Sequence, residues 1–137
     1  MDAKLLSQAV DLATANAAAG QLPFGALVAR DGEVLATGVN TALRDNDPAA
    51  HAEVEAVRAA CKALGTLDLR GAEVYSSCEP CPMCRTVASA AGIAVIWYAA
   101  RARDIPELGY PVPPVDFSAQ WVETDGATAP FDRYLAG

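Results

Sequence analysis

Apolar positions in the first part of the chain follow a helical pattern and then a strand-like one. Apolar residues from Leu5 to Ala13 recur at the spacing of one helical face, and Gly20 is expected to end that helix. Two apolar runs, residues 24–30 and 33–37, flank Asp31-Gly32, a pair that favours a tight turn between strands. The chain therefore predicts a helix followed by a β-hairpin.

The next segment is polar and is followed by a second helical pattern. Residues 40–47 show no periodicity and predict a loop. Asp47 followed by Pro48 is typical of a helix start, with the aspartate as N-cap and the proline at the first helical position. We expect this helix to run to about Leu64 and to stop at Gly65.

Strands and helices alternate through the middle of the chain. Residues 72–76 predict a short strand, and Pro82 opens a helix of small residues that ends near Ala91-Gly92. The continuous apolar run from Ile93 to Ala99 predicts a strand covered on both faces. Two hairpin strands followed by alternating helices and strands predict an α/β fold, a three-layer α/β/α sandwich with a mixed sheet of roughly five strands.

Periodicity fades after Arg103, and local signals take its place. We expect a short helix from Ile105 to Gly109, a Pro-rich crossing from Pro111 to Pro114, a strand near Trp121 and a terminal turn from Phe131 to Leu135. No repeat, low-complexity tract or linker divides the chain, so residues 1–137 are expected to form a single domain.

Composition places the chain among ordinary globular proteins: of its 137 residues, 53% are hydrophobic and 20% are charged. No apolar run approaches the ~20 residues that cross a bilayer, and the first residues lack the basic and apolar regions of a secretory signal. We therefore expect a cytoplasmic protein without a membrane partner. In that compartment, the crowding of Cys78, Cys81 and Cys84 favours metal or redox chemistry over disulfides.

The charge balance argues against a nucleic-acid partner. The formal net charge is −7, and the 10 lysine and arginine residues are scattered along the chain without a cluster. Proteins that bind RNA or DNA usually present a basic face, because neutralising phosphates supplies much of their affinity. A small, uncharged substrate is therefore favoured.

Two short segments carry the chemistry: His51-Ala52-Glu53 and Pro80-Cys81-Pro82-Met83-Cys84. Each is expected at the start of a helix, where partial positive charge favours thiolates, and thiolates bind zinc. His51, Cys81 and Cys84 supply three ligands for Zn2+ and leave the fourth tetrahedral position to water, which separates a catalytic site from a structural one. Glu53 is placed to move protons beside the metal without binding it, and H-x-E followed by P-C-x-x-C is the pattern of zinc nucleobase deaminases.

Simpler interpretations exist for single members of this set. A lone histidine is usually a core or surface group, and a lone C-x-x-C motif also occurs in redox proteins. The combination of His51, Glu53 two residues later and the Pro-Cys-x-x-Cys motif favours a catalytic zinc site. Cys78 also forms a C-x-x-C pair with Cys81, so a non-catalytic zinc module with three cysteines stays an alternative. The proline before Cys81 favours Cys81 with Cys84, which leaves Cys78 and Cys61 as buried apolar residues.

These motifs resemble the cytidine deaminase superfamily, and within it the branch of bacterial guanine deaminases. The resemblance spans roughly residues 5–104 and implies a cytidine deaminase-like fold, a Zn2+ cofactor and hydrolysis of guanine to xanthine and ammonia. Cytosine, an aminotriazine and another amino-purine or nucleoside stay alternatives, and tRNA adenosine deaminases share the same catalytic core. The matching segments are Pro23-Phe24-Gly25-Ala26, Gly38-Val39-Asn40, residues 46–54 and residues 77–84.

The resemblance implies two polar contacts with the substrate. Asp104, after the segment Tyr98-Ala99-Ala100, resembles an aspartate that contacts the substrate amine. Asn40 resembles an asparagine that holds a carbonyl or ring nitrogen of the base. An N-cap at Asp104 before Ile105 and an Asx turn at Asn40 are the simpler interpretations.

The rest of the expected site follows from the same resemblance. Backbone groups near Ala50 and Glu79 are expected to orient the ring, and Phe24 or a C-terminal aromatic residue to stack on it. In guanine deaminases the C-terminal segment closes over the pocket, which implies roles for Phe131 and Tyr134. The small residues of 87–91 allow a close approach between helices, and a homodimer is expected.

Overall fold

A computed structural model of the chain describes residues 1–110 and 116–137. Packing divides the chain into two compact units, Met1–Pro106 and Glu107–Gly137. The first unit holds every element from α1 to β4 and the turn that follows β4. That residues 1–137 act as a single domain stays a prediction.

The first unit is built on a mixed sheet with the strand order β2-β1-β3-β4. β1 runs antiparallel to β2 and to β3, and β3 runs parallel to β4. The predicted hairpin is confirmed: Asp31 and Gly32 adopt positive φ angles of 52° and 79°, as a tight turn between β1 and β2 requires. The strands are β1 Gly25–Arg30, β2 Glu33–Val39, β3 Glu73–Cys78 and β4 Ile96–Ala100.

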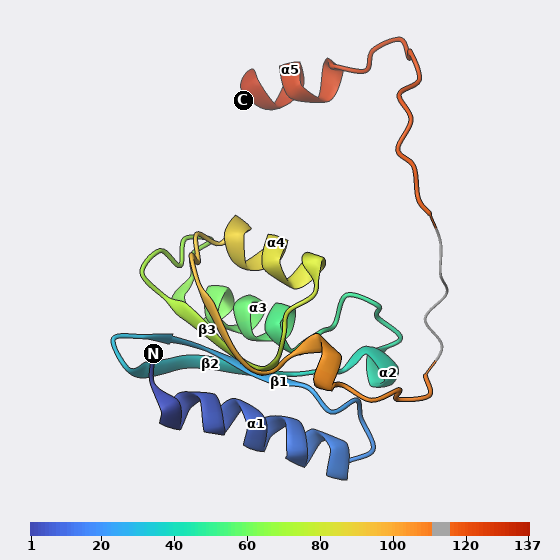
Figure 1. Ribbon diagram of the computed structural model, residues 1–137. Helices are drawn as coiled ribbons and strands as arrows, with labels where there is room; N and C mark the ends of the chain where they lie inside the picture. Colours follow the sequence, from blue (N-terminus) through green and yellow to red (C-terminus); the bar gives the residue numbers. More distant parts are fainter. Residues whose placement is uncertain (111–115) are drawn as a thin grey trace. The chain divides into compact units, whose positions relative to one another are not determined.

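Helices cover both faces of this sheet, which confirms the three-layer α/β/α sandwich (Figure 1). α1 (Ala3–Ala18) packs on one face, and α3 (Ala52–Leu64) lies with α4 (Pro82–Ala90) on the other. The larger buried cluster lies under α3 and α4 and is rich in alanine, so these helices sit close to the sheet. The smaller cluster, under α1, contains Leu5, Ala9, Leu27, Ala29 and Tyr75.

Gly38 in β2 explains how close α3 comes to the sheet. A Cβ atom at this position would lie 2.4 Å from the carbonyl oxygen of Ala52 and 2.4 Å from the amide nitrogen of Ala56, both in α3. Glycine therefore allows the first turns of α3 to lie directly on the strand. These turns follow His51 and carry Glu53, so the contact places both residues against the sheet.

One end of the sheet gathers the segments that carry the expected site residues. The register pairs Gly25 at the start of β1 with Val39 at the end of β2, and Cys78 at the end of β3 with Ala100 at the end of β4. Because β1 also pairs with β3 in antiparallel register, all four positions lie at the same end. The loops before β1 and after β2, β3 and β4 therefore meet there.

The boundaries of α1, α3 and α4 agree with the sequence except at the start of α3. α4 begins with a proline and α3 ends at a left-handed glycine, both as predicted. The N-cap of α3 is His51 and not Asp47, whose carboxylate accepts a hydrogen bond from the amide of Ala49 within a turn. A short helix, α2 (Ala42–Asp45), replaces part of the loop expected at residues 40–47.

The expectation of about five strands is wrong by one strand. The segment around Trp121 forms no strand in the described part of the chain, and the tryptophan side chain is exposed. The run from Ile93 to Ala99 becomes a strand only from Ile96 onward, and β4 lies at the edge of the sheet, where Tyr98 is 39% exposed. An apolar run alone does not distinguish a strand covered on both faces from an edge strand.

After β4 the chain turns, and the short helix expected from Ile105 to Gly109 does not form. Residues Ala102–Asp104 form a single 3₁₀ turn, and residues 105–110 have no regular structure. The Pro-rich crossing expected from Pro111 to Pro114 lies outside the described residues.

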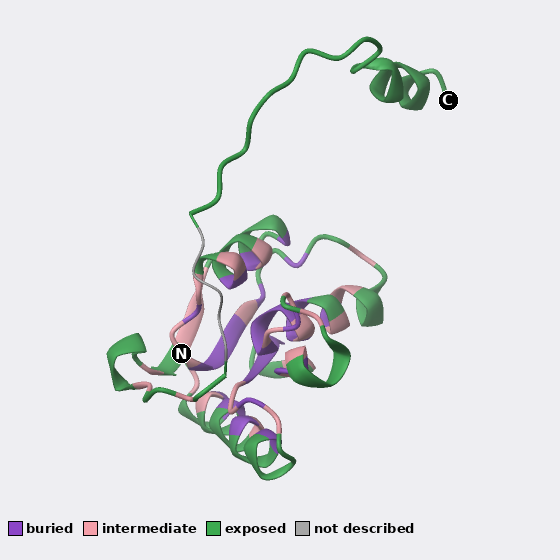
Figure 2. Cartoon of the chain, turned by 90° about the vertical axis from the view of Figure 1, so that its right-hand side faces the viewer, coloured by how far each residue is buried: buried purple, intermediate pink, exposed green. Residues whose placement is uncertain are grey.

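The second unit contains the short helix α5 (Ala129–Leu135), where the sequence predicts a terminal turn. The residues of α5 are exposed (Figure 2), and among its aromatic side chains Phe131 is 65% and Tyr134 is 84% exposed. Across the described residues of both units, no helix combines the length and the apolar character needed to span a membrane.

Candidate active site

Two helix starts bring three metal-binding side chains together. His51 is the N-cap of α3, Cys81 is the N-cap of α4, and Cys84 lies in the first turn of α4. Unpaired backbone N–H groups at helix starts add partial positive charge, which stabilises thiolates. The prediction that both motifs sit at helix starts is therefore confirmed.

The three ligand atoms lie at the distances of a tetrahedral metal site. Nδ1 of His51 lies 3.6 Å from Sγ of Cys81 and 3.5 Å from Sγ of Cys84, and the two sulfur atoms are 3.5 Å apart. Zn–S bonds of about 2.3 Å and Zn–N bonds of about 2.0 Å in a tetrahedron require roughly 3.5–3.8 Å between ligand atoms. This set of one imidazole and two sulfurs fits Zn2+.

The sulfur of Cys84 is a poor thiolate without a cation nearby. Burial raises the pKa of the Cys84 thiol, and the nearby carboxylate of Glu53 raises it further. A dication reverses this effect, because a thiol that coordinates a metal loses its proton. The Cys84 sulfur is therefore charged when a metal ion is bound beside it.

Cys78 and Cys61 lie apart from this group. The group within ligand distance in the described chain contains two of the four cysteines, Cys81 and Cys84, together with His51. Burial raises the pKa of the Cys78 thiol to about 12, and Cys61 packs against the core cluster under α3. This arrangement favours the three-ligand site over a structural site with three cysteines.

Glu53 lies in the first turn of α3, two residues after His51, and is only 5% exposed. Burial raises the pKa of its carboxyl group, and a contact with the Cys84 thiol counteracts part of this rise. A carboxyl group with a raised pKa beside metal-binding side chains is a candidate for taking up and releasing a proton during a reaction. The side chain is thus placed for the acid–base chemistry that the H-x-E spacing predicts.

Asn40 follows β2 at the same end of the sheet and is buried. Its Oδ1 accepts a hydrogen bond from the amide of Ala42, so the Asx turn is present. This bond uses the oxygen and leaves the Nδ2 group to donate to a ligand, so the turn and the predicted contact with a base are compatible. The amide of Thr41 donates to the carbonyl of Ala50 at 3.0 Å, which brings this loop beside His51.

Phe24, Ala50 and Glu79 also lie in loops at this end of the sheet. Phe24 precedes β1, is half-buried and packs against the core under α3. The amide and the carbonyl of Ala50 both form backbone hydrogen bonds, and the amide of Glu79 donates to the carbonyl of Ala100. The backbone amides of Ala50 and Glu79 are therefore already used. Their carbonyl oxygens can still accept a hydrogen bond from a ring, because each carbonyl oxygen has two lone pairs.

Asp104 ends the turn after β4 and is held by one neighbour. Its carboxylate accepts hydrogen bonds from the backbone amide of Arg101 at 3.0 Å and from the Arg101 guanidinium at 3.0 and 3.1 Å. The guanidinium lowers the pKa of this carboxyl group, which keeps it ionised. The helix N-cap before Ile105 is wrong, because no helix follows in residues 105–110. The contact of Asp104 with a substrate amine stays a prediction.

Three further residues shape this end of the sheet and were not predicted from the sequence. The hydroxyl of Ser77 accepts a hydrogen bond from the amide of Gly25 at the start of β1. The Arg85 guanidinium donates to the carbonyl of Pro80, directly before the first cysteine of the metal-binding group. Asn16 is a buried polar residue on the apolar face of α1, and that break in the pattern is the signal that the sequence offers.

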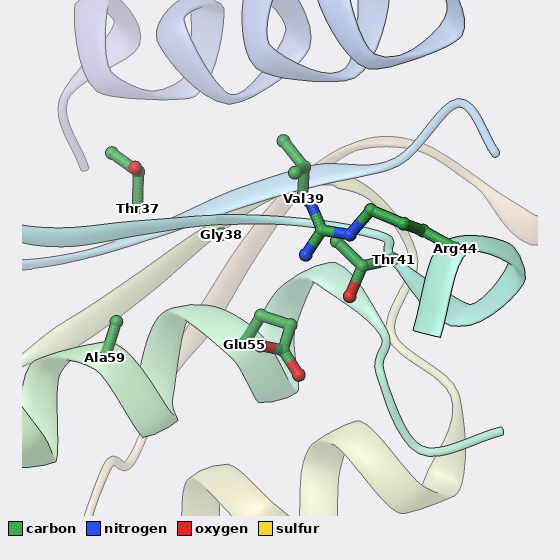
Figure 3. A pocket seen from close by; sticks show the side chains of 7 residues that line it. All are labelled: Thr37, Gly38, Val39, Thr41, Arg44, Glu55 and Ala59. Atoms are coloured by element: carbon green, nitrogen blue, oxygen red, sulfur yellow. The ribbon is translucent and has the colours of Figure 1, made fainter. Parts of the chain in front are cut away.

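A hollow of about 240 Å³ lies between β2, α2 and α3 (Figure 3). Arg44 and Glu55 line it together with Thr41, and Figure 3 shows their side chains in the space between the strand and the helix. None of the expected metal-binding or substrate-binding residues lines this hollow. Glu55 is therefore a carboxylate of α3 that lies outside the candidate site.

The chain is similar in sequence to known deaminases. A family model described as the cytidine and deoxycytidylate deaminase zinc-binding region matches residues 1–100. The guanine deaminase of Bacillus subtilis is 45% identical over 106 residues, which cover 77% of this chain and 68% of that protein. A tRNA-specific adenosine deaminase of Agrobacterium fabrum is 42% identical over 81 residues, which cover 59% of this chain and 53% of that protein.

The chain is also similar to a solved structure. The X-ray structure of guanine deaminase from Bacillus subtilis matches with a TM-score of 0.85 and 35% sequence identity, covering 100% of this chain and 96% of that one. The mixed sheet between two helical layers is therefore the fold of that structure.

Proposed function

The chain belongs to the cytidine and deoxycytidylate deaminase family, and we propose that it is a zinc-dependent hydrolase that converts free guanine to xanthine and ammonia. The observation that carries the proposal is the group of His51, Cys81 and Cys84, since three protein ligands are typical of catalytic zinc and leave one position for water. The similarity to the guanine deaminase of Bacillus subtilis supports guanine as the base.

Glu53 moves the protons in this reaction. Zn2+ held by His51, Cys81 and Cys84 would lower the pKa of a water molecule to about 7, so that a nucleophile for the amine-bearing carbon would be available at neutral pH. The Glu53 carboxylate takes one proton from this water and delivers it to the neighbouring ring nitrogen. The second proton passes through the same carboxylate to the amine, so that the C–N bond breaks, ammonia leaves and the oxygen of water remains on the ring as a carbonyl.

Three side chains orient the ring in this proposal. Nδ2 of Asn40 donates to a carbonyl oxygen or a ring nitrogen, because its Oδ1 is held by the turn. Phe24 offers an apolar surface at the end of the sheet. Asp104 accepts from the exocyclic amine and the adjacent ring N–H of guanine, a donor pair that suits a carboxylate. A small neutral base also agrees with the net charge of −7.

A homodimer and the closure of the pocket by Phe131 and Tyr134 belong to the same proposal. The exposed aromatic side chains of α5 support a covering role, because grouped exposed apolar residues usually mark a contact surface. The small residues of α4 support close helix contacts between two copies.

A tRNA adenosine deaminase is the second candidate, and the similarity to the Agrobacterium fabrum enzyme favours it. An RNA substrate requires a basic face for its phosphates, and the net charge of −7 argues against one. Binding of a tRNA measured across salt concentrations separates the two candidates. Tight binding that weakens steeply with salt supports the RNA enzyme, and no binding at moderate salt supports the free base.

Ammonia release from a panel of compounds tests the substrate. The zinc-loaded protein is incubated with guanine, guanosine, cytosine, adenine or an aminotriazine. We expect kcat/KM for guanine to exceed every other value by at least about tenfold, because a site that hydrogen-bonds a substrate group rejects analogues that lack it. A higher value for cytosine or adenine would replace guanine as the substrate, and no ammonia from any compound would refute the deaminase.

The variant Asp104→Ala tests the contact with the substrate amine. If the carboxylate binds guanine, kcat/KM should fall roughly tenfold, as for one lost charge-assisted hydrogen bond. Zinc content and melting temperature should change little, because this carboxylate is exposed. Arg101→Ala is the control, since it removes the guanidinium bonds that hold the carboxylate but leaves the carboxylate itself in place. Equal losses in both variants would assign the effect to the turn and remove Asp104 from the site.

A further inference from the structure

Asn16 interrupts the apolar face of α1, and it is only 8% exposed. Its Nδ2 group donates two hydrogen bonds, to the carbonyl of Leu22 at 2.8 Å and to the carbonyl of Asn40 at 2.9 Å. A primary amide has two N–H donors, and both are used here. One side chain of a helix therefore joins two loops that are distant in the sequence.

These two loops flank β1 and β2 at the site end of the sheet, and further bonds tie them together. Asn40 donates its backbone amide to the carbonyl of Phe24 at 3.1 Å, and the amide of Phe24 donates to the carbonyl of Leu22 at 2.8 Å. Both backbone groups of Asn40 are thus held, its amide by Phe24 and its carbonyl by Asn16. The position of its Cα atom is therefore set from two sides.

The side chain of Asn40 is held at a third point. Its Oδ1 accepts from the amide of Ala42, so the Nδ2 group has little freedom to turn. Neither hydrogen bond from the Asn16 side chain goes to α1, so this amide does not stabilise its own helix. Both bonds go to the loops that carry Phe24 and Asn40, the two side chains proposed to contact the ring.

We propose that Asn16 is a positioning residue for the base, one that holds the Nδ2 group of Asn40 and the ring of Phe24 in fixed relation to each other. This inference rests on the proposed function, because it takes both side chains as contacts of the substrate. It concerns binding and not proton transfer, since the hydrogen bonds of Asn16 reach neither Glu53 nor the metal-binding group. Loss of the amide therefore acts on KM.

Steady-state kinetics of Asn16→Leu test the inference, because leucine is similar in size and has no donors. We expect KM for guanine to rise roughly five- to tenfold, as for one lost hydrogen bond to the substrate, with kcat within about twofold of the parent. Zinc content should be unchanged. In a double-mutant cycle, adding Asn16→Leu to Asn40→Ala should raise KM little further, because the group that Asn16 positions is already gone.

The variant Leu5→Ala is the matched control for stability. Leu5 is also a buried residue of α1, and it packs with Leu27 and Tyr75 in the cluster under that helix. This variant should lower the melting temperature and leave KM unchanged. If Asn16→Leu does not fold, Asn16→Ser takes its place, because the shorter side chain loses both bonds without adding bulk, and the same rise in KM is expected.

The possible failures differ from one another. An unchanged KM in an active Asn16 variant, a rise in KM no larger than that of Leu5→Ala, or full additivity with Asn40→Ala would overturn the inference and leave the proposed function in place. A parent chain that turns over no compound of the panel would overturn the proposed function, and the inference with it.

Discussion

Glutamine in place of Glu53 is expected to reduce kcat by about 10²–10⁴-fold while the protein keeps its zinc and its fold. The amide has the shape of the carboxyl group, yet it cannot take a proton from water and pass it to a ring nitrogen. Burial already raises the pKa of this carboxyl group, so a neutral group at the same place is not expected to destabilise the fold. Turnover of guanine, zinc content and melting temperature are measured on the same preparation.

The variant Glu55→Gln is the matched control for this experiment. Glu55 lies two residues further along α3, pairs with Arg58 and lines the hollow of Figure 3, apart from the metal-binding group. The control loses the same charge from the same helix, and kcat should stay within about twofold of the parent, since an exposed ion pair contributes little. If Glu53→Gln turned over guanine as fast as this control, Glu53 would not be the residue that moves the protons.

The metal-binding group could be predicted because its parts are local in the sequence. His51 and Glu53 are two residues apart, and Cys81 and Cys84 are three apart, so the geometry within each pair follows from a single helix start. Only the approach of the two helix starts to each other depends on the tertiary fold. The occurrence of both motifs in one chain predicts this approach, because the two together are the pattern of zinc nucleobase deaminases. The ligand atoms accordingly lie 3.5–3.6 Å apart.

Where the same local sequence is compatible with two structures, the sequence could not predict which one forms. Asp47 accepts a hydrogen bond from the amide of Ala49, and an aspartate at a helix N-cap makes the same kind of local bond. The structure uses this bond in a turn and starts the helix only after His51. The apolar run of β4 is likewise compatible with a central and with an edge strand, and only the complete strand order decides.

Hydrogen bonds from side chains to residues distant in the sequence were harder still to predict. The bond from Asn16 to Asn40 joins residues 24 apart, and the bond between Gly25 and Ser77 joins residues 52 apart. An isolated serine is most often a surface residue, and the break that Asn16 makes in the apolar face of α1 does not identify its bonding partner, so neither bond could be predicted. The hydrogen bond between Asp104 and Arg101 could not be predicted either, because a carboxylate before an apolar residue is compatible with a helix cap, a turn or a ligand contact.

Alanine in place of Cys81 is expected to remove the bound zinc, and with it all measurable turnover. Two ligands would remain, His51 and Cys84, and burial raises the pKa of the Cys84 thiol, so a weakly held metal would no longer offset its protonation. The parent should carry about one zinc ion per chain, and added zinc should raise its melting temperature, as for any ligand that binds the folded state. The variant should lose its metal to a mild chelator and show no such rise. Elemental analysis after gel filtration and thermal melts with and without zinc measure both effects.

Parallel variants of the other two cysteines decide what a loss of zinc means. Cys78 and Cys61 lie outside the group within ligand distance, so Cys78→Ala and Cys61→Ala should both keep about one zinc ion per chain. A structural site with three cysteines predicts instead that Cys78→Ala loses zinc as readily as Cys81→Ala. Every one of these variants removes a single sulfur atom, so a difference in metal content reports coordination and not the loss of packing. If Cys81→Ala still carried about one zinc ion per chain, the metal would be bound elsewhere. That result would refute the catalytic site proposed for His51, Cys81 and Cys84.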